Sequence, residues 1–249
     1  GDLYAVSQRL FVAFGGALLA ALVGFFVIDG ASALAAFGAG LALWLMFGAL
    51  TDIALKSGVG TLALPVVWSR FKGLPRSVYG TALAHFGLGV TVMGIVAFTS
   101  LEIERIVVMR PGETLPIAGY TLSYKGIAPY QGPNFSEERG QFAYVDEAGR
   151  VLGEIISSKR LYTARQMPTT EAGIATRGFS QLYVSIGDAT SDGGLVVRVW
   201  WKPLILLIWL GGAVMMLGGT ISLFDRRLRV GAPAARKVKG MIEVKVTAS

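Results

Sequence analysis

Four long stretches of this chain contain no Asp, Glu, Lys or Arg. They run over Leu10–Ile28, Gly30–Thr51, Ser77–Leu101 and Pro203–Phe224. A helix needs about 20 mostly apolar residues to cross a bilayer, so we predict four transmembrane helices. A fifth uncharged run, Ser57–Ser69, is shorter and is interrupted by Pro65, which predicts an interfacial or re-entrant segment.

The composition excludes several other classes. Charged residues make up 16% of the chain, whereas a soluble domain carries about 25%. There are no cysteines, which excludes a disulfide framework and a zinc–cysteine site. Neither the dinucleotide-binding nor the phosphate-loop glycine motif occurs. A membrane protein is the class that remains.

The net charge of +7 is concentrated in two places. The loop 52–79 carries an excess of three positive charges and the tail from Asp225 an excess of five, whereas residues 102–202 hold 11 acidic and 11 basic side chains. Basic short loops remain in the cytoplasm, so we expect both termini and loop 52–79 to be cytoplasmic. Topology and anionic lipid explain this charge, and we do not expect nucleic acid as a partner.

Residues 102–202 have the pattern of an all-β domain. Apolar and polar residues alternate over Tyr120–Lys125, Gln181–Ile186 and Leu195–Trp201, the period of strands with one buried face. The sequence Asp146–Gly149 between two such runs predicts a hairpin. We therefore expect three helices within 1–101, an extracytoplasmic β sandwich or barrel of six to eight strands over 102–202, and the last helix with a basic tail over 203–249.

Small and aromatic residues of the spans favour packing and anchoring roles. Gly16, Ala20 and Gly24 lie four residues apart, a spacing that lets helices approach closely in lipid. Ala36 and Gly40 share this spacing in the second span. Two tryptophans precede the last span, and we predict them to be interfacial anchors: Trp200 and Trp201.

The single histidine, His85, lies inside the third predicted span. An ionisable residue within the membrane is a functional candidate by default, although a neutral imidazole bonded to a neighbouring carbonyl is the structural alternative. Gly89 follows one helical turn later on the same face and leaves room for a flat group such as a porphyrin. The chain has no H-x-x-x-H or G-x-S-x-G string and no self-contained Ser-His-Asp triad, so catalytic residues stay unassigned.

Several strings occur in a fixed order from the third span onward. They are Leu74–Gly80, Leu83–Gly87, Tyr130–Phe135, Arg160–Tyr162, Arg165–Ala172, Leu182–Gly187, Val197–Pro203 and Asp225–Arg227. Together they resemble the C-terminal portion of the CcmF family of cytochrome c-type biogenesis proteins, the haem lyase subunit of the multi-component maturation system. The resemblance extends from about Pro75 to Leu228, and we expect the chain to be a piece of a longer membrane protein.

The resemblance implies a cofactor and a set of partners. His85 would be one axial ligand of the iron of a haem b, with the second ligand supplied by a portion outside this chain. Haem would also be the substrate, delivered by a haem chaperone and attached to the thiols of a C-x-x-C-H apocytochrome c that thiol-reducing subunits keep reduced. The location would be the bacterial cytoplasmic membrane, with the β domain in the periplasm.

The same resemblance limits what this portion does alone. The family's tryptophan-rich haem-handling segment and its other histidines have no counterpart here, so this portion of a holocytochrome c synthase would lack the complete active site. Two alternatives stay open. One is a non-enzymatic scaffold whose β domain docks partner subunits. The other is half of a transporter, which the absence of charged residues in the spans disfavours.

The depth of His85 in the membrane follows from the helix rise. If the third span begins near Tyr79, six residues at ~1.5 Å each place His85 about 9 Å into the helix. We therefore expect it in the cytoplasmic third of the bilayer, a depth that suits an internal haem b and not the site of thiol attachment.

Overall fold

The computed structural model describes residues 11, 13–22, 24, 32–164 and 166–225. Three of its helices are long and apolar enough to cross a membrane: α2 (Ala33–Ser57), α4 (Arg76–Leu101) and α5 (Leu206–Leu223). The predicted span Leu10–Ile28 lies partly outside the described residues, and what is described of it includes a shorter apolar helix, Ala13–Leu22. The predicted basic tail after Asp225 lies outside them.

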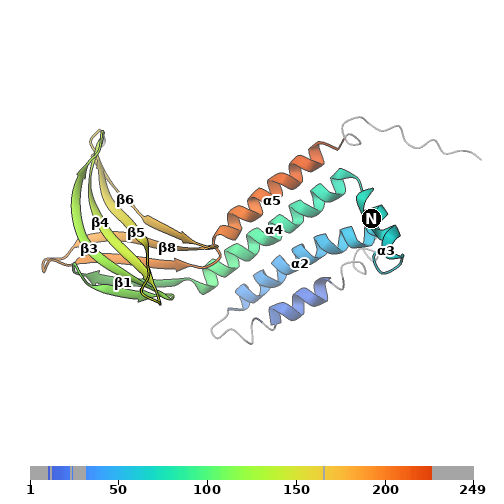
Figure 1. The fold of residues 1–249 in the computed structure, drawn as a ribbon, viewed down its shortest axis with the longest axis horizontal. Helices are drawn as coiled ribbons and strands as arrows, with labels where there is room; N and C mark the ends of the chain where they lie inside the picture. The colour runs from blue at the N-terminus through green and yellow to red at the C-terminus, as the bar shows by residue number, and fades with distance from the viewer. Residues whose placement is uncertain (1–10, 12, 23, 25–31, 165, 226–249) are drawn as a thin grey trace, which may run out of the picture.

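Helix α4 lies between α5 and α2 (Figure 1). Its contact with α5 is made through glycines seven residues apart, Gly80 and Gly87, which face Gly218 and Gly211. A Cβ atom built on Gly87 would lie 2.7 Å from the carbonyl oxygen of Gly211. The two backbones therefore touch, as close helix pairs in membranes do.

Helix α2 packs on the opposite side of α4 and also contacts the segment Ala13–Leu22. Gly40 of α2 faces Ala17 and Ala21, so this contact uses glycine as the sequence predicted. For Gly16 and Gly24, no residue that the structure describes lies within 4 Å of the position a Cβ atom would take, so their predicted packing role has no described partner.

Helix α3 (Leu64–Lys72) occupies the short uncharged run and lies at the end of the bundle opposite the strands (Figure 1). Pro65 stands in its first turn, a position that needs no backbone donor. The helix has nine residues, too few to cross a bilayer. The carbonyl of Phe71 accepts a hydrogen bond from the Tyr79 hydroxyl, which ties α3 to the start of α4.

Residues 103–202 form a sandwich of two antiparallel sheets, with nine strands in the described part of the chain. One sheet has the order β1-β9-β8-β7 and the other β2-β3-β4-β5-β6. The bounds are β1 Ile103–Met109, β2 Thr114–Ile117, β3 Tyr120–Gln131, β4 Phe135–Asp146, β5 Val151–Tyr162, β6 Met167–Glu171, β7 Gly173–Arg177, β8 Ser180–Ala189 and β9 Leu195–Lys202.

The core of the sandwich consists of alternating side chains from both sheets. Phe142, Leu122 and Val184 are fully buried. Leu122 and Val184 lie in two of the segments with the period-2 pattern, and Phe142 lies on β4, which pairs with β3. The predicted hairpin is also present: Gly149 has φ +76°, and the Asp146 carboxylate accepts hydrogen bonds from the Ala148 and Arg150 amides.

The helices continue directly into the sandwich. Only Glu102 separates α4 from β1, and three residues separate β9 from α5. Because β1 and β9 are antiparallel neighbours, with Ile103 opposite Trp201, the two connections lie side by side. An ion pair of 3.3 Å between Lys202 and Glu102 joins them.

The two predicted anchor tryptophans are part of strand β9. Trp201 packs against the sandwich core with its ring 5.2 Å from that of Tyr120. Trp200 makes an edge-on contact of 5.8 Å with Tyr183. Strand β9 extends through Lys202 and brings both rings into contact with aromatic residues of the β domain just before α5 begins, and their predicted role as interfacial anchors stays a prediction.

Candidate functional site

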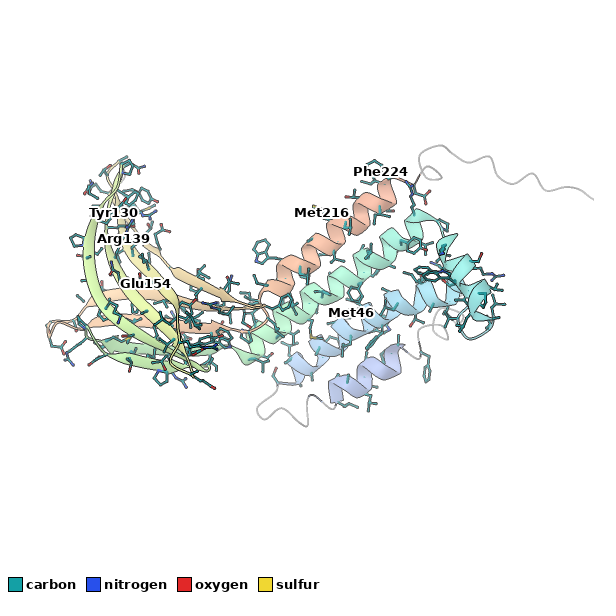
Figure 2. All side chains as sticks on the ribbon, in the orientation of Figure 1. Met46, Tyr130, Arg139, Glu154, Met216 and Phe224 are labelled. Carbon is teal, nitrogen blue, oxygen red and sulfur yellow. The ribbon has the colours of Figure 1, made fainter. Side chains whose placement is uncertain are left out.

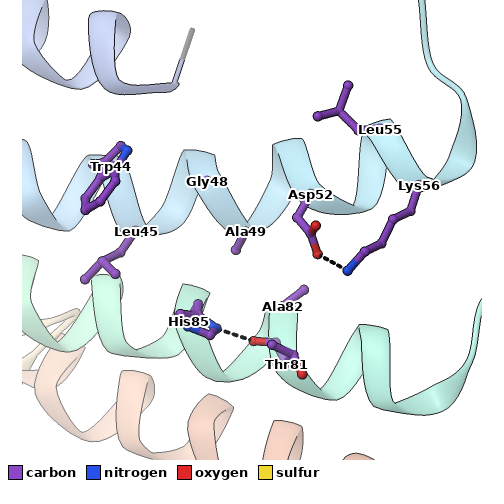
Figure 3. Close-up of a pocket in the computed structure, with 10 residues that line it drawn as sticks. All are labelled: Trp44, Leu45, Gly48, Ala49, Asp52, Leu55, Lys56, Thr81, Ala82 and His85. Carbon is purple, nitrogen blue, oxygen red and sulfur yellow. Dashed lines mark hydrogen bonds and ion pairs between the residues drawn. The ribbon is translucent and has the colours of Figure 1, made fainter. Parts of the chain in front are cut away.

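A cavity of about 820 Å³ lies between α2 and α4 and contains His85 in its wall. This volume falls in the range of cofactor sites, about 300–1,000 Å³. The wall is mostly apolar and is drawn in Figure 3; it consists of Trp44, Leu45, Gly48, Ala49, Asp52, Leu55, Lys56, Thr81, Ala82 and His85.

A hydrogen bond fixes the tautomer of His85. Its Nδ1 atom lies 2.8 Å from the backbone carbonyl oxygen of Thr81, one helical turn earlier (Figure 3). A carbonyl oxygen can only accept, so Nδ1 carries the proton, and in the neutral ring Nε2 keeps a free lone pair. Metal-binding histidines show this arrangement, with one nitrogen bonded to a carbonyl and the other turned to the metal.

His85 is exposed rather than buried in the bundle. Helix α4 begins at Arg76, three residues earlier than the predicted end near Tyr79. His85 therefore lies about 13 Å from the start of α4 and about 24 Å from its end at Leu101, at ~1.5 Å per residue. It is closer to the α3 end than to the β domain, as the sequence predicted, but deeper.

Gly89 does not provide room for a porphyrin. A Cβ atom at this position would lie 2.6 Å from the Met46 side chain and 2.7 Å from the carbonyl oxygen of Ala42. Gly89 is the point at which α2 packs against α4. The missing side chain serves helix packing, and the space predicted beside Gly89 is occupied by α2.

The cavity wall also carries two polar features that the sequence analysis did not select. Asp52 and Lys56, one helical turn apart on α2, form an ion pair of 2.6 Å and are each more than two-fifths exposed. The indole Nε1 of Trp44 is buried and has no hydrogen-bond partner among the described residues. A ligand in the cavity would meet one histidine nitrogen and the Asp52–Lys56 ion pair, together with apolar surface.

These residues fit a haem group, which is a large, mostly apolar ring with two carboxylate arms. His85 Nε2 suits the iron, the apolar wall suits the ring, and the Lys56 ammonium suits a carboxylate. His85 is the single histidine of the chain, and the described residues contain no group of three or more His, Cys, Asp or Glu that could hold a metal.

A second cluster of polar and aromatic side chains lies at the end of strands β3, β4 and β5 that is far from the helices. It brings together residues from these three strands. Glu137 of β4 has a side chain that is 1% exposed, and it accepts hydrogen bonds from Arg139 (2.5 Å) and Arg160 (2.9 Å). Ser158 donates a further hydrogen bond of 2.8 Å. Burial alone would raise the pKa of Glu137, but these three hydrogen bonds outweigh it and lower the pKa.

Aromatic rings cover the two arginines of this cluster. The Arg139 guanidinium lies 3.3 Å from the centre of the Tyr130 ring, and that of Arg160 lies 4.1 Å from the centre of the Phe135 ring. Figure 2 shows Tyr130 and Arg139 near the tip of the sheet, away from the helices. Cross-strand register makes this possible, since Glu137 pairs with Tyr130 on one side and with Arg160 on the other.

Comparison with known proteins identifies the β domain first. Residues 100–203 match a family model described as the CcmF C-terminal beta-sandwich. A solved structure of the cytochrome c haem lyase CcmF superposes on 90% of this chain and 34% of its own, with a TM-score of 0.65 at 16% identity, which supports the fold.

Curated relatives extend the match to nearly the whole chain. The cytochrome c-type biogenesis protein CycK of Rhizobium meliloti is 56% identical over 95% of this chain, and CycK of Bradyrhizobium diazoefficiens is 43% identical over 98%. The chain spans 35% and 37% of these relatives, respectively. The chain belongs to the CcmF family of cytochrome c-type biogenesis proteins.

Proposed function

We propose that this chain takes part in cytochrome c maturation as the portion of a haem lyase that holds one axial ligand of a haem b. The observation that carries the proposal is the geometry of His85: Nδ1 is engaged by the Thr81 carbonyl, and Nε2 is left for a ligand in a cavity of cofactor size. When bound, the haem supplies a redox-active iron that can exchange electrons.

Each residue of the cavity then has a definable task. The Thr81 carbonyl orients the His85 ring and holds the proton on Nδ1, so that Nε2 is directed to the iron. The apolar wall, including Leu45 and Ala82, suits the apolar ring of the haem. Lys56 holds a positive charge at the α3 end of the cavity. The second axial ligand comes from outside this chain, because the chain contains no other histidine.

The test uses the complete protein in membranes, compared with His85→Ala and with Leu88→Ala as a control on the same helix. Leu88 is exposed and does not line the cavity. We expect His85→Ala to lose the visible spectrum of haem b and the yield of holocytochrome c, and Leu88→Ala to keep both. Added imidazole should restore part of the haem to His85→Gly. Full haem b in His85→Ala would contradict the ligand assignment.

The orientation proposed for the chain is a periplasmic β domain with both ends of the helical part in the cytoplasm. It is supported by the excess of basic residues in loop 52–79 and by the neutrality of 102–202. Labelling of single cysteines at Lys72 and at Arg110 with a membrane-impermeant maleimide tests it. Only position 110 should react from the periplasmic side, and the reverse would overturn the orientation.

A second candidate function is docking of the other maturation components by the β domain. The Glu137 cluster favours it, since three separate strings converge at one tip of the sheet, where Tyr130 remains 42% exposed. The partners would be the apocytochrome c, the thiol-reducing subunits and the haem chaperone. Crosslinking from a photoreactive residue at Tyr130 in the complete protein should capture one of these three, and crosslinks at position 151, on the β4–β5 hairpin, should not.

A further inference from the structure

The β7–β8 turn is bound to the first turn of helix α5. The backbone amide of Leu206 donates a hydrogen bond of 3.1 Å to the carbonyl oxygen of Phe179, and the amide of Leu204 donates one of 3.1 Å to the hydroxyl of Ser180. The first amides of a helix have no acceptor within the helix, and Ile205 at the N-cap makes no side-chain cap. The turn of the β domain supplies the acceptor for the Leu206 amide, while the next two amides, of Leu207 and Ile208, donate to the carbonyl oxygens of Leu204 and Ile205.

This capping fixes the height of the turn relative to the membrane. Helix α5 is apolar from its first residue and has the length and composition of a membrane span. In lipid, an unsatisfied backbone amide costs several kcal/mol, so the capped end and the turn that caps it stay together. The turn lies where α5 enters the bilayer and is not free to move into solvent.

The side chain of Phe179 is 52% exposed at this height. Trp209, one helical turn into α5, is 76% exposed. Aromatic rings are enriched at the boundary between headgroups and acyl chains. Phe179 and Trp209 are the exposed aromatic side chains at this end of α5, whereas Trp201 packs against the core of the β domain and the partly exposed Trp200 contacts Tyr183.

We propose that Phe179 inserts into the lipid interface on the β-domain side of the membrane and anchors the β domain to the bilayer. The occupant of this surface is lipid, since the surface is continuous with the membrane-crossing face of α5. The anchor is independent of haem. The cap uses the main-chain carbonyl of Phe179, so the side chain can be replaced without removing the cap.

The chain has no cysteine, which makes a single introduced cysteine a clean reporter. The complete protein, with any cysteine elsewhere replaced by serine, is labelled with the environment-sensitive fluorophore NBD at Phe179→Cys and reconstituted into vesicles of phosphatidylcholine and phosphatidylglycerol. Ile174→Cys is the matched control: Ile174 is 49% exposed on the same hairpin, about 10 Å from the turn at ~3.3 Å per residue.

The label at 179 should emit at shorter wavelength than the label at 174, and lipids with a spin label near the headgroup should quench only the label at 179. Equal, water-like emission at both positions would overturn the proposal. A short-wavelength emission at 179 without quenching by lipid would also overturn it, because protein would then cover the ring. Quenching at both positions would show a membrane-bound domain without a specific anchor and would contradict it as well.

Discussion

Lys56 supplies the cationic end of the cavity that contains His85. It is the one cation in the cavity wall formed by the described residues, and its present partner, Asp52, leaves it 44% exposed. An ammonium has three donors, so it can bind a haem carboxylate without leaving Asp52.

We expect Lys56→Met to weaken haem binding by about tenfold, the effect of losing a charge-assisted hydrogen bond of ~1.5 kcal/mol. Titration of the haem-free complete protein with haemin, followed by absorption, measures the change. Lys72→Met is the control, because Lys72 lies over the Trp68 ring of α3, outside the cavity. Equal losses in both variants would show a general effect of charge and no role for the cavity.

Glu137 makes the β domain sensitive to acid. Its folded-state pKa is lowered from an ordinary value of 4.5, so its stabilising effect is present above that value and is lost as the pH falls through the lowered pKa. We expect the thermal unfolding midpoint of the β domain to fall when the pH is lowered below 4.5. In Glu137→Gln this midpoint should depend less on pH.

The same substitution should destabilise the domain at neutral pH by about 3 kcal/mol, because it removes the charge between Arg139 and Arg160. Glu138→Gln, one residue along on the other face of β4 and exposed, should have almost no effect. Thermal unfolding followed by near-ultraviolet circular dichroism compares the two, and equal stability of the two variants would contradict the role of Glu137.

At the scale of the elements, the contact between α4 and α5 depends on particular glycines. A Cβ atom at Gly211 would clash with the Thr91 hydroxyl oxygen and the Gly87 carbonyl oxygen, whereas one at Gly212 would have no described residue within 4 Å. These two neighbours form a matched pair. We expect Gly211→Ala to cost about 1–3 kcal/mol by overpacking and Gly212→Ala to be neutral or slightly stabilising.

Thermal unfolding of the complete protein in detergent measures this difference, with retention of haem b as a second readout. If both alanines are tolerated equally, the helices are not in backbone contact. The packing of Gly211 and Gly218 also bears on the alternative of half of a transporter, because glycines in direct contact with another helix backbone are poor hinges for a moving gate.

The elements could be predicted wherever one property dominates. Runs without charge gave three membrane-length helices, and alternation gave β3, β8 and β9. The number of strands was underestimated because β2, β6 and β7 have four or five residues, too short for a period to be visible. Helix α3 was expected as a segment, but the sequence alone did not show that it is helical.

The site was harder to predict, because it depends on which faces meet. His85 stood out as an uncommon residue in an apolar span. The sequence could not show that Gly89 faces α2 and not the cavity, because Gly89 and His85 lie one helical turn apart on the same side of α4. Asp52 and Lys56 are ordinary loop charges until α2 is seen to extend to Ser57 and to bring them into the cavity wall. The Glu137 cluster required the register of three strands.

At the scale of the whole molecule, the β domain enters and leaves through adjacent strands. Directly opposed residues such as Ile103 and Trp201 have Cα atoms about 5 Å apart. We expect replacement of 103–202 by a short Gly/Ser linker to preserve the α4–α5 contact and haem b at His85, while holocytochrome c is lost. Absorption spectra of the purified variant and cytochrome yield in cells check both expectations; loss of haem b would show that the bundle needs the domain.

The converse experiment leaves the domain in place and removes the histidine. His85 lies about 24 Å from the β-domain end of α4 at ~1.5 Å per residue, far from every strand that the structure describes. We therefore expect the β domain in His85→Ala to keep the near-ultraviolet dichroism and the thermal unfolding midpoint it has in the unmodified protein. A lower midpoint would indicate coupling between the cavity and the sandwich.

The short connections between the strands and the helices have a mechanical consequence. With one residue between α4 and β1, three between β9 and α5, and an ion pair across both, the joint has little freedom to bend. The long strands β3 to β5 extend away from this joint (Figure 1). We therefore expect a force applied at the Glu137 tip to reach α4, the helix that carries His85, through the sandwich and this joint.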